Sequence, residues 1–207
     1  MQHSDKYIPA LSHDLLTPLY DPLVRLFMRE SKFKRRLIDQ AEIGEGQRVL
    51  DVGCGTGTLA LMIKRAQPRA EVTGLDGDAK VLRIAKAKAA KAGVHLQFDE
   101  GMSYELPYAD GSFDRVLSSM MLHHLSTDDK KRTLNEVHRV LRPGGEAHVV
   151  DFGPPRTPYT RLITFVLARM EQAAANIKGL LPEMFRAAGF DRVEETGQFM
   201  TVAGALA

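Results

Sequence analysis

Residues 49–61, VLDVGCGTGTLAL, constrain the fold of this chain more than any other stretch. Residues 49–52 form a short run, apolar except for Asp51, that is typical of a buried parallel strand. The three glycines that follow allow a tight turn and let a ligand approach the backbone closely. A helix is expected to begin near Thr58, with its first amide groups facing the crevice beyond the strand ends. The stretch therefore predicts a small-molecule site.

The spacing of Gly53, Gly55 and Gly57 bears on what that ligand is. It reads G-x-G-x-G, whereas the dinucleotide fingerprint reads G-x-G-x-x-G. Asp51 stands two residues before the first glycine, and its carboxylate would repel a pyrophosphate, which prefers bare amides and the positive end of a helix. S-adenosylmethionine carries a sulfonium and no phosphate. We therefore expect Asp51, Cys54 and the three glycines to bind that cofactor.

Residues 49–57 resemble the first motif of class I S-adenosylmethionine-dependent methyltransferases, hydrophobic-hydrophobic-Asp-hydrophobic-Gly-x-Gly-x-Gly, at every position. Leu122-His123-His124 and Leu141-Arg142-Pro143-Gly144-Gly145 match two later features of the branch similar to menaquinone and ubiquinone methyltransferases. The resemblance covers about residues 49–152. It implies a doubly wound, Rossmann-like α/β fold whose mainly parallel seven-stranded sheet carries an antiparallel C-terminal edge.

Composition excludes several classes of function. A length of 207 residues suits one α/β domain with a modest extra segment. The net charge of +2 gives no electrostatic case for nucleic acid, and a single cysteine cannot form an internal disulfide. No apolar run approaches the ~20 residues of a membrane-spanning helix. We therefore expect a soluble, cytoplasmic protein, either a monomer or a homodimer.

The domain organisation is read from linkers and periodicity. Residues 1–46 are expected to be a helical segment covering the site, and residues 47–207 the cofactor-binding domain. Residues 153–178 follow a Gly-Pro-rich linker and are interpreted as a core or dimer helix, or as a lid. One N-terminal helix is expected to start at Asp21-Pro22. A second helix would bury one apolar face, formed by Phe33, Leu37, Ile38 and Ala41. Its basic residues, Lys32, Lys34, Arg35 and Arg36, would largely face solvent or an acidic lipid surface.

The remaining elements alternate between strands and helices. A capping box at Ser126 and Asp129 should open a long helix, and Asp78 should cap an earlier one that Gly93 ends. Residues 142–145, Arg-Pro-Gly-Gly, are interpreted as a hard stop. Strands are expected at 71–76, 94–98, within 111–119, at 146–152, 191–196 and 199–205, and helices at 59–66, 79–92, 159–175 and 180–189.

Further cofactor contacts are expected at three places. Asp76 ends the second strand about 20 residues beyond the glycines, where an acidic residue accepts hydrogen bonds from ribose, and Gly77 leaves room for the adenosine. The resemblance implies an adenine-binding Asp in the loop after the third strand, but this chain has Met102 there. Met102 could pack on the ring and the Ser103 amide could donate to it. The resemblance also implies that Ser118, near the end of the fourth strand, lies against the methionine part of the cofactor.

His123 is the candidate general base, because it follows the strand that ends beside the reactive methyl and imidazole titrates near neutrality. The alternative is a packing or capping histidine. The predicted function is methyl transfer to a small apolar, aromatic or lipid-like acceptor. Two alternatives stay open: a non-catalytic binder of the cofactor or its product S-adenosylhomocysteine, and a nicotinamide oxidoreductase, which would lack its glycine spacing here.

Overall fold

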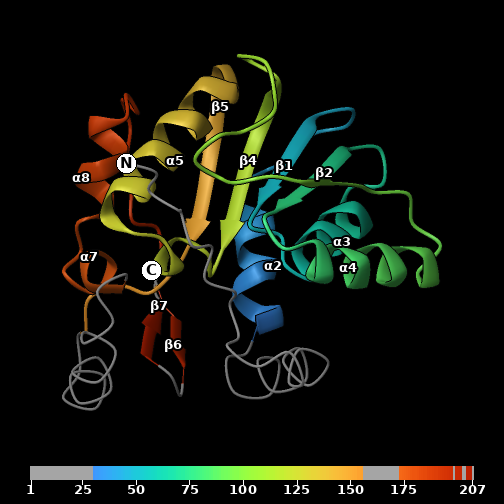
Figure 1. Cartoon of the computed structure of the whole chain (residues 1–207), viewed down its shortest axis with the longest axis horizontal. Helices are drawn as coiled ribbons and strands as arrows, with labels where there is room; N and C mark the ends of the chain where they lie inside the picture. Colours follow the sequence, from blue (N-terminus) through green and yellow to red (C-terminus); the bar gives the residue numbers. More distant parts are fainter. Residues whose placement is uncertain (1–29, 156–172, 198, 202–203, 207) are drawn as a thin grey trace, which may run out of the picture.

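The central feature of the fold is a parallel sheet of five strands in the order β3-β2-β1-β4-β5 (Figure 1). The computed structural model describes residues 30–155, 173–197, 199–201 and 204–206. Because the chain passes from β3 at one edge to β4 beside β1, the strand order reverses between β1 and β4. This confirms the doubly wound α/β class. The strands are β1 (Arg48–Val52), β2 (Glu71–Asp76), β3 (Gln97–Glu100), β4 (Phe113–Ser119) and β5 (Leu141–Val150).

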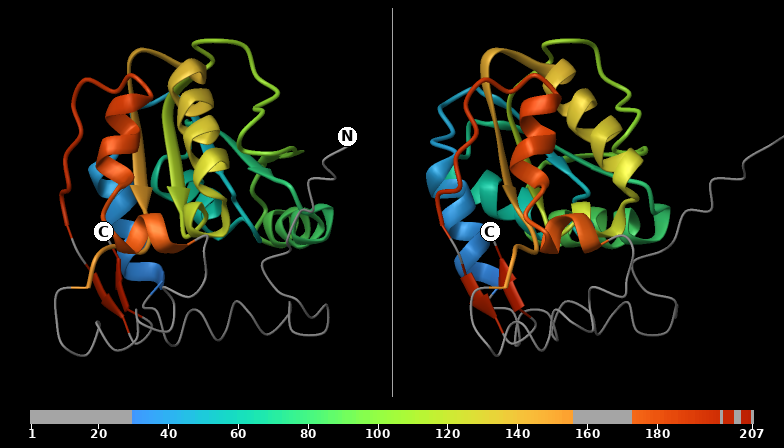
Figure 2. Two further views of the ribbon diagram at one scale, coloured as in Figure 1. Left: turned by 60° about the vertical axis from the view of Figure 1, so that its left-hand side comes forward. Right: turned by 90° about the vertical axis from the view of Figure 1, so that its left-hand side faces the viewer.

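Helices cover both faces of this sheet, and α2 and α5 lie on opposite sides of it (Figure 2). A short 3-10 helix, η1 (Leu122–His124), follows β4. The small helices α7 and α8 pack beyond the main sheet, against η1 and α5 respectively. The helices are α2 (Glu30–Gln40), α3 (Thr58–Ala66), α4 (Ala79–Lys91), α5 (Thr127–Val140), α7 (Ala174–Ile177) and α8 (Leu181–Ala187).

Alternation along β1 builds the two cores. Val49 packs in the core under α2, α3 and α4, while Leu50 and Val52 pack in the core under α5. All three side chains are fully buried, as expected for a central parallel strand. Asp51 follows Val49 by two residues, so its side chain lies on the same face of the strand and is buried under α2, α3 and α4.

The predicted caps are confirmed. The Asp78 side chain accepts from the Lys80 amide at 2.7 Å, and the Ser126 hydroxyl accepts from the Asp129 amide at 3.1 Å. The expected strand at 94–98 begins later, at Gln97, because the Val94 amide bonds back to the Ala89 carbonyl and prolongs the end of α4. Helix ends and strand starts compete for the same residues at such boundaries.

The amphipathic face predicted for residues 30–41 is confirmed, with one correction. Phe33, Leu37, Ile38 and Ala41 are buried against α3 and the sheet. Lys34, expected on the solvent side, is buried as well and forms an ion pair with Glu30 one turn earlier. The pair shares the inward face because residues four apart lie on the same side of a helix.

The helix does end just before the stop expected at residues 142–145, at Val140, but β5 begins earlier than the expected residue 146, at Leu141 directly after α5. Leu141 pairs with Phe113, and the ladder resumes with Glu146 opposite Arg115. The four residues between them bulge out of the ladder, and Gly144 adopts a φ of 75° that suits the bulge. The Pro-Gly-Gly sequence therefore kinks a strand rather than preceding one.

The predicted seven-stranded sheet with an antiparallel edge is not confirmed in the part of the chain that the structure describes. Residues 191–197 form no strand, and β6 (Phe199–Thr201) pairs with β7 (Gly204–Leu206) as a separate antiparallel sheet. The helix start at Asp21 and most of the helix expected at 159–175 lie outside the described residues. Within the described residues, no helix has the length and apolarity needed to cross a membrane.

Candidate active site

The predicted site residues meet at the carboxyl ends of the strands. The glycine loop follows β1, Asp76 ends β2, η1 follows β4 and Asp151 follows β5, and the arrowheads of β4 and β5 point to this same end of the sheet (Figure 1). Parallel strands place their carboxyl ends along one edge, and in doubly wound folds the ligand crevice is expected where the strand order reverses. The Met121 side chain packs on Gly53, which brings η1 beside the glycine loop.

The glycine loop is held to β2 by its own backbone. The amides of Gly53 and Cys54 both donate to the Leu75 carbonyl, at 2.8 and 3.0 Å. Gly53, Gly55 and Gly57 have φ values of 70°, 53° and 73°, which disfavour any side chain. These three glycines thus give the tight turn that the sequence predicts.

The three glycines differ in what surrounds them. A Cβ at Gly53 would lie 2.2 Å from the Met121 Cγ, and a Cβ at Gly57 would lie 2.9 Å from Ala85 and Phe98. A Cβ at Gly55 would meet nothing within 4 Å. Gly53 and Gly57 are therefore required by packing inside the protein, whereas the space beside Gly55 is open.

Asp51 is a buried carboxylate with one oxygen unused. It is 1% exposed, and its Oδ2 accepts from the Ala60 amide of α3 at 3.1 Å. Its Oδ1 has no hydrogen-bond partner among the described residues. Burial raises the pKa of Asp51 to about 7, while the charge of Lys34 and the Ala60 bond oppose the rise and Asp76 adds to it. A buried oxygen of this kind is costly without a donor or a cation beside it.

Asp76 faces the glycine loop. Its Oδ2 accepts from the Gly55 amide at 2.8 Å and its Oδ1 from the Asp78 amide at 3.0 Å. Burial raises the pKa of Asp76, and bonds from the amides of Asp78, Gly55 and Gly77 oppose that rise. Each carboxylate oxygen can accept a second bond, so two hydroxyls could still be bound here.

The side chains of Cys54 and Ser118 serve the fold. The Cys54 sulfur lies 2.9 Å from where a Cβ would stand at Gly74, and burial, followed by the charges of Asp51 and Asp76, raises the pKa of its thiol. The Ser118 hydroxyl donates to the Val52 carbonyl at 2.9 Å and links β4 to β1.

The loop between β3 and β4 carries Met102 and Ser103, and α5 anchors it. The Ser103 hydroxyl bonds to Thr133 at 2.9 Å, while Met102 is partly exposed. Arg139 donates to the carbonyls of Tyr108 and Leu106, at 2.8 and 3.1 Å. The loop expected to line the adenine is therefore anchored by bonds from α5.

His123 is paired with a residue that sequence reasoning missed. Its Nδ1 lies 2.8 Å from the Oδ1 of Asp151, which is 1% exposed and directly follows β5. The His123 ring also packs on Phe152, with the centroids 4.6 Å apart. The position of Asp151 in the sequence could have indicated its role, because Asp151 lies at the end of β5 as Asp76 lies at the end of β2.

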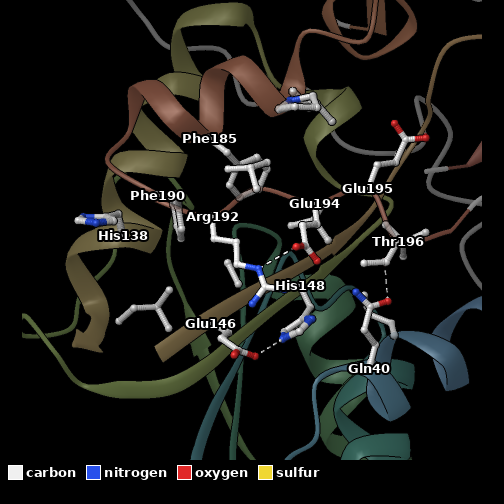
Figure 3. Close-up of a pocket in the computed structure, with 18 of the residues that line it drawn as sticks. Gln40, His138, Glu146, His148, Phe185, Phe190, Arg192, Glu194, Glu195 and Thr196 are labelled. Carbon is white, nitrogen blue, oxygen red and sulfur yellow. Dashed lines mark hydrogen bonds and ion pairs between the residues drawn. The ribbon is translucent and has the colours of Figure 1, made fainter. Parts of the chain in front are cut away.

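A large cleft lies elsewhere, along the outer edge of β5 (Figure 3). Its volume is about 1370 Å³, and its polar lining is largely paired within itself, with Arg192 on Glu194, His148 on Glu146 and Thr196 on Gln40. None of the predicted site residues is among the described residues that line it. The candidate site is therefore the crevice at the strand ends.

Comparison with known proteins agrees with this geometry. Residues 49–145, from β1 to the bulge in β5, match the methyltransferase domain family. Residues 49–145 are thus similar to a methyltransferase domain. The match contains the glycine loop, Asp76, the Met102 loop and His123, so the domain family spans the part of the chain that forms the crevice.

Two curated relatives of this methyltransferase domain are named demethylmenaquinone methyltransferase. The protein from Thermus thermophilus is 39% identical over 142 residues, which are 68% of this chain and 64% of that protein. The protein from Listeria monocytogenes is 29% identical over 203 residues, 86% of this chain and 85% of that one. The chain thus spans somewhat less than two thirds of the Thermus relative.

Solved structures confirm the fold. A methyltransferase of Bacillus halodurans superposes with a TM-score of 0.67 at 24% identity, covering 80% of this chain and 71% of that one. A phosphoethanolamine N-methyltransferase from Haemonchus contortus, in complex with S-adenosylhomocysteine, also gives a TM-score of 0.67, at 20% identity over 79% of this chain and 38% of that one. At these identities the likeness concerns the fold.

Proposed function

We propose that this protein transfers a methyl group from S-adenosylmethionine to a small-molecule acceptor of quinone or phenol type. The observation that carries the proposal is the open side of Gly55, which lies in a tight glycine turn between two acidic residues, Asp51 and Asp76. The methyltransferase domain family supports the reaction. The names of the two demethylmenaquinone methyltransferases support the class of acceptor.

The residues of the crevice fit this cofactor. The unused oxygen of Asp51 suits the cationic amino acid part, because a buried carboxylate oxygen needs a donor or a cation. The carboxylate of Asp76 suits the ribose hydroxyls, and Gly55 and Gly77 leave the backbone accessible. Met102 and the Ser103 amide would adjoin the adenine. When bound, the cofactor supplies an activated methyl group, and the protein's task is to exclude water and orient the acceptor.

The acceptor pocket is assigned to segments outside the cofactor-binding motifs. We propose that residues 1–46 and 153–178 cover the site and select the acceptor. The position of α2 supports this, since its first turn places Glu30 and Lys34 in the buried charged group that includes Asp51. The cytoplasmic location, the oligomeric state, lipid contact and the absence of nucleic-acid binding stay predictions.

The cofactor is tested by binding. S-adenosylmethionine and S-adenosylhomocysteine should raise the melting temperature and release measurable heat in calorimetry. Gly55→Val should abolish both signals. The matched control is Gly46→Val, because Gly46 also has a positive φ of 70° and open space around it but lies before β1, at the opposite end of that strand from the glycine loop. Absence of binding to the native protein at millimolar ligand would contradict the proposal.

Catalysis is tested separately from binding. Labelled S-adenosylmethionine should transfer its methyl group to a member of a panel of hydroquinones and substituted phenols. Met102, in place of the expected adenine-binding Asp, is the one feature that favours a non-catalytic binder. Tight binding of both ligands with no transfer to any acceptor in the panel would support that alternative over the enzyme.

A further inference from the structure

Asp151 is a buried carboxylate that contacts His123 and Phe152. Its Oδ1 accepts from the Phe152 amide at 2.7 Å and contacts the His123 Nδ1 at 2.8 Å. Its Oδ2 lies 3.4 Å from the His123 amide. The carboxylate is 1% exposed, and only 11% of the His123 side chain surface is exposed. The ring is therefore held by an inner residue that does not itself reach the solvent.

The surroundings of Asp151 favour its ionised form. Burial alone would raise the pKa of Asp151, but the His123 charge and the hydrogen bonds from His123 and Phe152 outweigh burial and lower it. The buried ammonium of Lys130, which donates to the Leu125 carbonyl at 2.8 Å, is a further cationic neighbour. His124, the other titratable group beside the ring, packs on His123 with centroids 4.0 Å apart.

An ionised carboxylate can only accept hydrogen bonds, so Nδ1 of His123 must carry the proton. In the neutral ring, Nε2 then holds the free electron pair. In histidine bases generally, the hydrogen bond made by one ring nitrogen determines which nitrogen carries the proton and which can accept one. The tautomer is thus set by the position of Asp151 at the end of β5.

We propose that Asp151 is a positioning residue that fixes His123 as the Nδ1–H tautomer, so that Nε2 accepts the proton of a hydroxyl-bearing acceptor. The inference rests on the proposed function and deepens it. The acceptor's O–H proton passes to Nε2 while the acceptor bonds to the methyl carbon, and the electron pair of the broken S–C bond stays on sulfur. Charge is conserved, because the imidazolium replaces the sulfonium as the cation.

The place of η1 puts this base at the cofactor loop. Met121 packs directly on Gly53, and η1 begins at the next residue. Helix α7 packs against η1. An acceptor with a phenolic or enolic hydroxyl matches a neutral imidazole base better than an amine that is protonated at neutral pH.

The tautomer is tested directly, without any acceptor. Nitrogen-15 NMR of histidine-labelled protein at about pH 9, well above the ordinary histidine pKa of about 6.5, separates protonated from unprotonated ring nitrogens. We expect a protonated Nδ1 and an unprotonated Nε2 for His123. In Asp151→Ala the pattern should reverse, because a free neutral imidazole prefers the proton on Nε2. The Asp151→Asn variant should keep the native pattern, since its oxygen can still accept from Nδ1 and from the Phe152 amide.

The matched control is Asp114→Ala. Asp114 is also a buried carboxylate that accepts from a backbone amide, that of Arg48 at 2.6 Å, but it lies at the opposite end of β4. Its loss should destabilise the protein and leave the His123 tautomer unchanged. A native tautomer in Asp151→Ala, or an Nε2–H tautomer in the native protein, would overturn the inference. If Asp151→Ala does not fold, the His123 tautomer in the native protein and in Asp151→Asn tests the inference without it.

Kinetics separates this inference from the function on which it rests. With an acceptor in hand, Asp151→Ala should lower kcat about 10²-fold, the usual contribution of a general base, with cofactor affinity unchanged. Asp151→Asn should recover most of that loss. Equal turnover in Asp151→Ala and native protein would overturn the positioning role. Failure of the native protein to bind the cofactor would instead overturn the proposed function and leave the tautomer result intact.

Discussion

Replacing Asp51 by asparagine should stabilise the empty protein while weakening cofactor binding. The side chain is fully buried, one oxygen accepts from the Ala60 amide, and the other has no partner among the described residues. Asparagine keeps the size and the acceptor and removes the charge. The free energy that burial costs the charged form should therefore be recovered in the variant.

The magnitude and its pH dependence follow from the pKa. Burial raises the pKa of Asp51 from 3.8 to about 7. At about 1.4 kcal/mol for each tenfold change in proton affinity, the charged form costs at most about 4 kcal/mol. Because the folded state binds the proton more tightly than the unfolded state, this group destabilises the fold as pH rises from about 4 to about 7, and the cost is complete above that range.

Urea denaturation measures this effect across pH. The unfolding free energy of Asp51→Asn minus that of the native protein should be near zero at about pH 4 and grow by up to about 1.4 kcal/mol per pH unit to a plateau above about pH 7. In calorimetry at pH 8, S-adenosylmethionine should bind the variant more weakly. A difference that does not change with pH, or a less stable variant at pH 8, would refute the reasoning.

Asp114→Asn provides the control for this experiment. Asp114 is also buried, but its carboxylate forms an ion pair with Arg142 at 2.8 Å and accepts from the Arg48 amide. Removing that charge breaks the ion pair with Arg142, whose side chain is half exposed, so this variant should be less stable than the native protein at pH 8 by up to about 1 kcal/mol. The opposite signs of the two variants distinguish an unpaired buried carboxylate from a paired one.

Three further predictions concern the cofactor walls. Asp76→Ala should weaken S-adenosylmethionine binding by about 1–3 kcal/mol in calorimetry, since two hydroxyls lose their acceptor, and an unchanged Kd would contradict the ribose assignment. Met102→Asp should tighten binding if this position faces the adenine amino group; weaker binding would place the residue elsewhere. Arg139→Ala should cost about 1–3 kcal/mol of stability in denaturation and loosen the adenine wall, because the bonds to Tyr108, Leu106, Asp110 and Glu136 are lost together. Equal protease resistance of residues 101–112 in the variant and the native protein would argue against that anchor.

Local rules in the sequence were sufficient for most elements of the main sheet and for the turn of the glycine loop. The glycine spacing predicts the turn after β1 because positive φ values are a local property of the backbone. The alternation of β1 and the caps at Asp78 and Ser126 likewise depend on neighbours a few residues away. Asp76 could be assigned to the crevice because parallel strands align their carboxyl ends.

Only the tertiary structure decided which charged residues are buried and which side chains meet. Lys34 looks solvent-facing in a basic run, yet it is buried with Glu30 beside Asp51, because the packing of α2 on α3 and the sheet extends across that face. The pairing of His123 with Asp151 joins residues 28 positions apart through the adjacency of β4 and β5. The bulge in β5 and the separate closing strands also depend on which edges pair. Such contacts link distant parts of the chain, and local propensity contains no information about them.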